Sequence, residues 1–129
     1  MNRKRRALPR PTEGELELLG ILWEKGPATV RDLHQEIGVR RGVGYTSVLK
    51  LLQIMTEKGL VEREESGKAH IYRPAASQQE TQDQMVRDMS ERLFAGSAAQ
   101  LALHALALEP VSDRELEELR NLIEKRKRP

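Results

Sequence analysis

The sequence predicts a mainly α-helical protein with one small β-hairpin, and three observations lead to this fold class. Thr12, Ser77 and Ser112 each stand three positions before a glutamate, which is the capping-box signature of a helix start. Apolar residues then recur at three- and four-residue spacing along most of the chain. Only residues 57–74, EKGLVEREESGKAHIYRP, depart from this period, because two short charged runs flank a Ser-Gly pair there.

The composition indicates a globular protein and excludes several classes of function. With 129 residues, 38% hydrophobic and 33% charged, the chain can form one modest core or two small ones. The absence of cysteine excludes disulfide frameworks, thiolate zinc sites and cysteine nucleophiles. No apolar run approaches the length of about 18 residues that a membrane span needs, so we expect no membrane insertion. The basic start lacks the apolar segment of a secretory signal, and a cytoplasmic location is expected.

The net charge of +2 conceals two basic ends. Five of residues 1–10 are Lys or Arg and none is acidic, while residues 120–129 hold five basic side chains and one acidic side chain. Basic ends serve either as solvated tails or as contacts to a polyanion, and both roles stay open for the predicted flexible arm at residues 1–10. Nucleic-acid binding therefore has to be argued from the placement of individual residues.

Two helices are expected at the start of the chain. The first begins at Thr12 and ends at Gly26-Pro27, because proline cannot continue the preceding turn. The second begins at Thr29, is about two turns long, and ends at Gly38, since glycine suits a left-handed helix end. Their inward residues are expected to be Leu16, Leu19, Leu22, Trp23, Val30, Leu33 and Ile37.

A third helix is expected from Gly44 to Lys58, after the turn VRRGVG, with Gly59 as its end. Its apolar and polar residues segregate to two faces at helical spacing. The inward face holds Tyr45, Val48, Leu49, Leu52 and Met55, and the outward face holds Thr46, Ser47, Lys50, Gln53 and Glu57.

The next segment predicts a β-hairpin. Leu60–Glu65 and Ala69–Arg73 flank the turn pair Ser66-Gly67, and Pro74 blocks further strand pairing because it has no backbone N–H.

From Ser77 onward the pattern is helical, with helices expected over residues 77–95, 97–108 and 112–127. The middle one, SAAQLALHALAL, is apolar on nearly every side, so it must be buried on every side. A second copy of the chain is the simplest cover, and packing against the N-terminal half is the alternative. The residues assigned to the dimer contact are Met89, Leu93, Leu101, Leu103, Leu106, Leu108, Leu116 and Leu119.

The order of helix, short helix, longer helix and hairpin is that of a winged-helix DNA-binding domain, predicted at residues 11–75. Residues 76–129 are then a helical dimerisation domain. In a winged helix the third helix enters the major groove with short polar side chains, and the wing reaches neighbouring phosphates. Gly42 and Gly44 allow a close approach of the chain to phosphate. The residues assigned to DNA binding are Arg40, Arg41, Tyr45, Thr46, Ser47, Lys50, Gln53 and Lys68.

Each of these assignments has a simpler alternative. Thr46 and Ser47 also suit the first turn of any helix, Tyr45 also suits a core, and Lys68 also suits a solvated loop. The three wing glutamates would repel phosphate and argue for contact at the wing tip alone; they are Glu62, Glu64 and Glu65.

Three segments carry a resemblance to a known family. They are LPRPTEGELELLGILWEKGPATVRDLH, GYTSVLKLLQIMTEKGLVERE and GKAHIYRP, within a resemblance that covers residues 8–126. In them the chain resembles the penicillinase-repressor family (BlaI/MecI/CopY), winged-helix regulators of bacterial resistance operons. The resemblance implies a homodimeric repressor that reads an inverted-repeat operator. It further implies that Thr46 and Ser47 face the groove and that Lys68 sits at the wing tip.

The chain departs from the family in the residues that serve induction. Family members released by a membrane sensor protease are cut at an Asn-Phe bond, but the corresponding stretch here is Leu103-His104-Ala105. The copper-responsive branch carries C-terminal cysteines, and this chain has none. A sensor protease with another site preference stays open as a partner, and the inducing signal is not predicted.

The sequence contains no arrangement typical of an enzyme. His34, His70 and His104 lie far apart without companions at ligand spacing, so neither a metal site nor a cofactor is expected. No glycine-rich phosphate loop, nucleophile elbow or paired carboxylates occur.

The leading hypothesis is a sequence-specific, homodimeric transcriptional repressor that occludes a promoter on an inverted-repeat operator. One alternative is a winged-helix module whose outer face binds another protein. A second is a regulator of another winged-helix family that is controlled by a small ligand.

Overall fold

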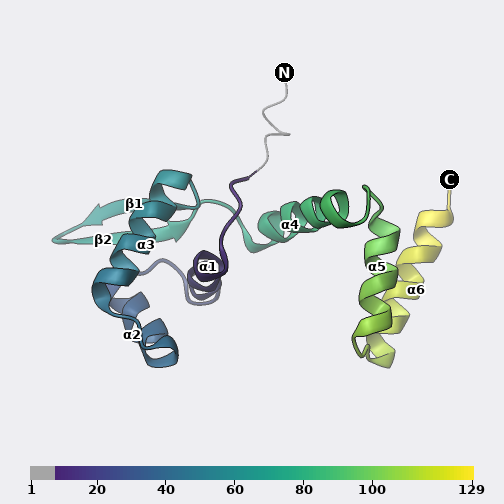
Figure 1. Ribbon diagram of the computed structural model, residues 1–129, viewed down its shortest axis with the longest axis horizontal. Coiled ribbons are helices and arrows are strands. Elements are labelled where there is room, and N and C mark those ends of the chain that lie inside the picture. The colour runs from purple at the N-terminus through teal and green to yellow at the C-terminus, as the bar shows by residue number, and fades with distance from the viewer. Residues whose placement is uncertain (1–7) are drawn as a thin grey trace, which may run out of the picture. The chain divides into compact units, whose positions relative to one another are not determined.

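The structure is a computed structural model that describes residues 8–129. Within that range it contains six helices and one two-stranded antiparallel sheet, which confirms the predicted fold class (Figure 1). The chain forms two compact units that divide between Met85 and Val86, and we call them the first unit and the second unit. Most of the predicted basic arm, residues 1–7, lies outside the described residues.

Two capped helices begin the first unit. They are α1 (Glu13–Lys25), with Thr12 as its N-cap, and α2 (Val30–Arg41), with Thr29 as its N-cap. In each, the cap hydroxyl accepts the backbone N–H three residues later, and the carboxylate of that residue accepts the cap N–H. Both predicted helix starts are therefore confirmed, and Gly26 ends α1 as expected.

The predicted end of α2 at Gly38 is wrong. The helix continues to Arg41, and Gly42 takes the left-handed conformation with φ of 65°. Gly38 serves a close approach instead: a Cβ at this position would lie 3.1 Å from the Nε2 atom of His34. Arg40 and Arg41 consequently belong to the last turn of α2 and not to the turn that follows it.

The third helix, α3 (Tyr45–Lys58), begins and ends close to the predicted positions, and Gly59 is its left-handed C-cap. Its inward face was predicted correctly for Val48, Leu52 and Met55, which are buried. Tyr45 was assigned to that face, but the side chain is 48% exposed. The reason is its place at the first position of the helix, beyond the end of the core.

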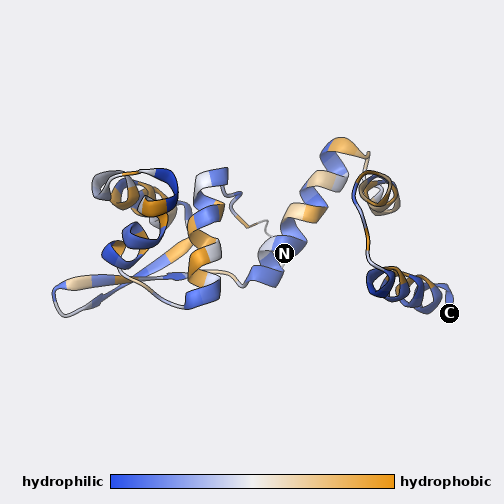
Figure 2. Ribbon diagram, turned by 90° about the horizontal axis from the view of Figure 1, so that it is seen from below, coloured by the Kyte–Doolittle hydropathy of each residue, from blue (hydrophilic) through white to orange (hydrophobic). Residues whose placement is uncertain are grey.

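The core of the first unit is shared by α1, α2, α3 and the hairpin (Figure 2). Every buried hydrophobic residue of the described chain belongs to it. The buried residues are Leu18, Leu19, Ile21, Leu22, Ala28, Val30, Leu33, Ile37, Val48, Leu52, Met55, Leu60, Val61 and Tyr72.

The predicted hairpin is present, with strands β1 (Val61–Ser66) and β2 (Ala69–Pro74). The turn that joins them is Gly67-Lys68, so the predicted turn pair Ser66-Gly67 is wrong by one residue. A further pairing was not predicted. Ala28, just before α2, forms two backbone hydrogen bonds with Tyr72 in β2, with N···O distances of 3.0 and 2.8 Å. This bridge attaches the hairpin to the start of α2.

A buried ion pair joins the start of α1 to the end of α3. The carboxylate of Glu15 is 2% exposed and accepts the Thr12 backbone N–H at 2.8 Å and the Lys58 ammonium at 2.6 Å. Burial raises the pKa of Glu15, but the hydrogen bonds to Lys58 and Thr12 and the positive charge of Lys58 outweigh it and leave the pKa below its ordinary value. The pair fixes the ends of both helices.

The first unit includes the start of α4 (Gln78–Leu93), because the division between units falls inside that helix. The indole N–H of Trp23 donates to the Ala76 carbonyl at 3.0 Å, which holds the link between β2 and α4. The capping box predicted at Ser77 and Glu80 is confirmed by both of its hydrogen bonds.

The second unit contains the rest of α4, then α5 (Ala98–Leu108) and α6 (Asp113–Lys127), which run in opposite directions (Figure 1). The third capping box, Ser112 with Glu115, is confirmed. No residue of α5 or α6 is buried, so the expected burial of α5 on all sides is not found within the single chain. None of the described helices is long and apolar enough to cross a membrane.

Candidate nucleic-acid interface

The outer face of α3 is mainly polar. The core residues of this helix occupy one side, so the opposite side faces away from the first unit. Thr46, Ser47, Lys50 and Gln53, the four residues predicted to read bases, are all exposed on this helix. The sequence interpretation missed Ile54 beside them, which is 39% exposed although it is apolar.

The two arginines at the end of α2 are already paired with carboxylates. Arg40 lies 3.2 Å from the Glu36 carboxylate, and Arg41 lies 3.1 Å from that of Glu17. Lys25, and less strongly Arg40, hold the pKa of Glu36 below its ordinary value. A phosphate that approached either arginine would compete with its carboxylate, so these two cations are less available than their exposure indicates.

A histidine fixes the turn between α2 and α3. The carbonyl of Val43 lies 3.1 Å from His34 Nε2, and since a carbonyl only accepts, the Nε2–H donates. The imidazole also meets the Tyr45 ring edge to face, with centroids 5.9 Å apart. Tyr45 is therefore held at the start of α3 by a contact outside the core.

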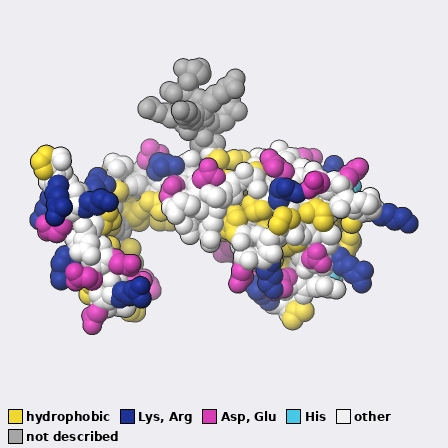
Figure 3. Space-filling model, turned by 180° about the vertical axis from the view of Figure 1, so that it is seen from behind, with side chains coloured by type: hydrophobic (Ala, Val, Ile, Leu, Met, Phe, Trp, Pro, Cys, Tyr) yellow, Lys and Arg dark blue, Asp and Glu magenta, His cyan; other side chains and the backbone are white. Residues whose placement is uncertain are grey.

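Lys68 lies directly after Gly67 at the wing tip and is exposed. Lys and Arg side chains project from the hairpin end of the first unit in the space-filling view (Figure 3). Among the described residues, no carboxylate lies within 4 Å of the Lys68 amine. One of the three wing glutamates, Glu64, is paired with Arg73. That pairing reduces the repulsion that the wing would exert on phosphate.

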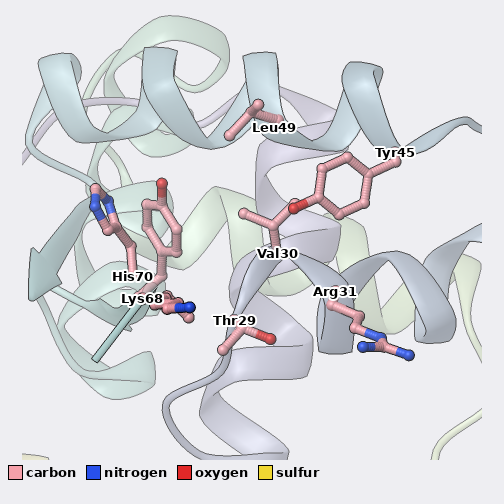
Figure 4. Close-up of a pocket in the computed structure, with 9 residues that line it drawn as sticks. Thr29, Val30, Arg31, Tyr45, Leu49, Lys68 and His70 are labelled. Atoms are coloured by element: carbon pink, nitrogen blue, oxygen red, sulfur yellow. The ribbon is translucent and has the colours of Figure 1, made fainter. Parts of the chain in front are cut away.

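The structure brings Tyr45 and Lys68 together on one hollow of about 450 Å³ between α2, α3 and the hairpin (Figure 4). Arg31, which the sequence interpretation missed, lines the same hollow. In the sequence, only the spacing of the inward residues Val30 and Leu33 indicates that Arg31, which lies between them, faces outward. Thr29, Val30, Leu49, Ala69, His70 and Tyr72 complete the lining.

The residues assigned to the dimer contact form no core in the single chain. Met89, Leu93, Leu103, Leu106, Leu108 and Leu116 are exposed, and Leu101 and Leu119 are half-buried. Val86, Leu122 and Ile123 are exposed apolar residues of the same helices that the assignment left out.

The three histidines lie in three different elements. His34 is in α2, His70 in β2 and His104 in α5. Within residues 8–129, no group of three or more His, Asp or Glu side chains is arranged to hold a metal ion.

Comparison with known proteins gives one family and several relatives. The model of the family described as "Penicillinase repressor" matches residues 11–125. "Methicillin resistance regulatory protein MecI" of Mammaliicoccus sciuri is 24% identical over 115 residues, which are 89% of this chain and 94% of that protein. "Transcriptional regulator BlaI" of Mycobacterium tuberculosis is 36% identical over 70 residues, which are 52% of this chain and 51% of that protein.

A solved structure shows the same fold. The solution structure of the monomeric form of Bacillus licheniformis BlaI in complex with the blaP half-operator matches with a TM-score of 0.51 and 16% identity. The match covers 57% of this chain and 89% of that chain.

Proposed function

This chain belongs to the penicillinase repressor family, and we propose that it is a DNA-binding transcriptional repressor that acts as a homodimer on an inverted-repeat operator. The observation that carries the proposal is the mainly polar outer face of α3, which stands beside a hairpin with an exposed lysine at its tip. The solved relative of the same fold is described in complex with a half-operator, which supports this function.

In the proposed complex, α3 lies in the major groove. Thr46, Ser47, Lys50 and Gln53 are then the residues that meet base edges, because they occupy the outer face of the helix. Tyr45 and Lys68 position the protein on phosphates, and the paired Arg40 and Arg41 contribute less. Base contacts set the sequence preference, whereas phosphate contacts set the general affinity and its salt dependence.

The proposed homodimer forms through the apolar side chains of the second unit. Several leucines of α5 and α6 are exposed to water, which is unfavourable for apolar side chains. A twofold contact between two chains would bury these leucines. Two reading helices related by a twofold axis contact half-sites about 34 Å apart, or one turn of the duplex. An operator with inverted symmetry is the target that such a pair matches, and a dimer bound there would block a promoter.

The test is selection of bound fragments from a random duplex library, followed by sedimentation of the purified protein with and without the selected duplex. We expect a palindromic consensus and a complex of two chains per duplex. A protein that binds no duplex above background at about 0.1 M salt would contradict the DNA-binding function. A consensus without symmetry, bound by one chain, would contradict the homodimer alone.

A further inference from the structure

We propose that the hollow between α2, α3 and the hairpin holds the backbone of one DNA strand, with Arg31 and Lys68 on its phosphates. Arg31 then belongs to the DNA-binding surface, although no pattern in the sequence assigned it there. The inference rests on the proposed function and adds to it the place where the duplex backbone lies.

The lining of the hollow suits a sugar-phosphate chain. Its rim carries two cationic side chains, Arg31 from α2 and Lys68 from the wing, together with the phenol of Tyr45 (Figure 4). Its floor includes Val30 and Leu49, which are apolar. A phosphodiester offers anionic oxygens to the cations, and the deoxyribose carbons can rest on the apolar floor. A free anion would use only the rim.

The charges around the hollow favour an anionic occupant. Arg40, Arg41 and Arg73 each have a carboxylate partner. Within residues 8–129, by contrast, no carboxylate lies within 4 Å of the charged groups of Arg31 or Lys68. Two like charges that line one hollow repel each other, and a phosphate between or beside them relieves that repulsion. Desolvation of these cations is also less costly because no internal ion pair has to break.

The carboxylates nearest in sequence to Arg31 and Lys68 do not line the hollow. Asp32 accepts the Thr29 backbone N–H at 3.2 Å and is engaged in the cap of α2. Glu65 is paired in register with His70, so it stands on the hairpin side. Neither Asp32 nor Glu65 is among the described residues that line the hollow, whose lining includes two cations and no carboxylate.

A backbone bridge links the two walls of the hollow without any ligand. Arg31 stands on the first turn of α2, and the residue that precedes this turn by two positions, Ala28, is hydrogen-bonded to Tyr72 of the hairpin. The bridge therefore couples the wall formed by α2 to the wall formed by the wing. Linked walls lose less backbone entropy on binding than two independent segments would, which favours affinity.

The first experiment measures duplex affinity and its salt dependence by fluorescence anisotropy for Arg31→Ala and Lys68→Ala. Each variant is expected to bind every duplex roughly tenfold more weakly at about 0.1 M salt. Each should also lower the slope of log K against log salt by about one. Arg31→Lys should keep most of the affinity and slope, because a phosphate contact requires the charge. Arg114→Ala on α6 is the matched control for loss of one positive charge, and it should bind as the parent does.

The second experiment places the contact on the duplex. Single phosphates of the selected operator are replaced in turn by neutral methylphosphonates. The parent protein should lose affinity at the contacted phosphates, and Arg31→Ala should become insensitive to one of them. Lys68→Ala should become insensitive to the same phosphate or to its neighbour on the same strand.

Two outcomes would overturn the inference while leaving the proposed function in place. One is that Arg31→Ala binds DNA as tightly as the parent, while Lys50→Ala, measured in the same assay as a positive control, binds more weakly. The other is a pair of sensitive phosphates on opposite strands or several nucleotides apart, which would mean that Arg31 and Lys68 do not share one strand. A parent protein that binds no duplex would instead remove the proposed function itself.

Discussion

The two units of the chain use their apolar residues in opposite ways. In the first unit the apolar faces of α1, α2 and α3 meet one another and the hairpin, and their central side chains are buried. In the second unit, α5 and α6 have apolar residues at the same helical spacing, yet none of these residues is buried. Periodicity therefore predicts which face of a helix is apolar, but it does not predict what covers that face.

The two units are expected to differ in what stabilises them. A closed core stabilises the first unit whether or not another chain is present, whereas the second unit would gain most of its stability from contact with a partner. Four predictions test this contrast, and they follow from the largest expected effect to the smallest.

Leu103→Asp on α5 should have the largest effect, because Leu103 is 60% exposed in the single chain and is assigned to the proposed dimer contact. A carboxylate buried in an apolar contact should raise the dimer dissociation constant roughly a thousandfold, or about 4 kcal/mol. Sedimentation velocity over a concentration series measures this change. Binding to the full operator should weaken, while binding to a half-operator should stay unchanged.

The matched control for that variant is Ile54→Ser on α3, which also replaces an exposed apolar residue by a polar one. It should leave the oligomeric state unchanged, because Ile54 lies in the unit whose core is closed. If Leu103→Asp sediments as the parent does, α5 is covered in some other way and the contrast between the units fails.

A pair of leucine truncations compares the two units directly. Leu52→Ala removes a fully buried side chain from the core of the first unit and should reduce the free energy of unfolding by about 3 kcal/mol. Leu108→Ala removes the same atoms from an exposed position on α5 and should cost less than about 0.5 kcal/mol when measured at concentrations where the chain is monomeric. Urea denaturation of both variants gives the two values. Equal costs would show that the second unit has a closed core of its own.

Local signals in the sequence were sufficient for most of the fold. Capping boxes, the glycine at position 59 and the helical period define the ends and faces of the helices, because these features depend on neighbours within one turn. Gly38 shows the limit of such signals. A glycine serves equally as a left-handed helix end or as a gap for a neighbouring side chain, and only the position of His34 decides between them.

The candidate site was predictable only in the part that lies on one helix. The outer residues of α3 follow from its period, whereas the hollow is built from segments about forty residues apart in sequence, around Arg31 and Lys68. The bridge between Ala28 and Tyr72 brings these segments together, and it is a backbone contact without a side-chain signature. For the same reason the ion pairs of Arg40 and Arg41 were not foreseen.

Glu15→Gln should reduce the stability of the first unit by about 2 kcal/mol at neutral pH, because it weakens the buried contact with Lys58. The folded-state pKa of Glu15 is lowered, so its contribution is present above the ordinary value of 4.5 and is lost as the pH falls through the folded-state pKa. Urea unfolding at pH 7 and at steps below pH 4.5 measures the difference between parent and variant. That difference should shrink toward acid, and a constant difference would mean that packing and not charge stabilises the contact.

Within the first unit, the smallest loss of stability is expected for Trp23→Phe, which tests where this unit ends. The variant keeps an aromatic ring but loses the N–H that donates to the Ala76 carbonyl, at a cost of about 1 kcal/mol. Because this bond holds the link between β2 and α4, hydrogen exchange should accelerate at the start of α4 around Thr81, while the core helix α3 keeps its protection. Equal protection of Thr81 in parent and variant would mean that α4 is held by its other contacts. In that case the ring of Trp23, and not its N–H, would couple the helix to the first unit.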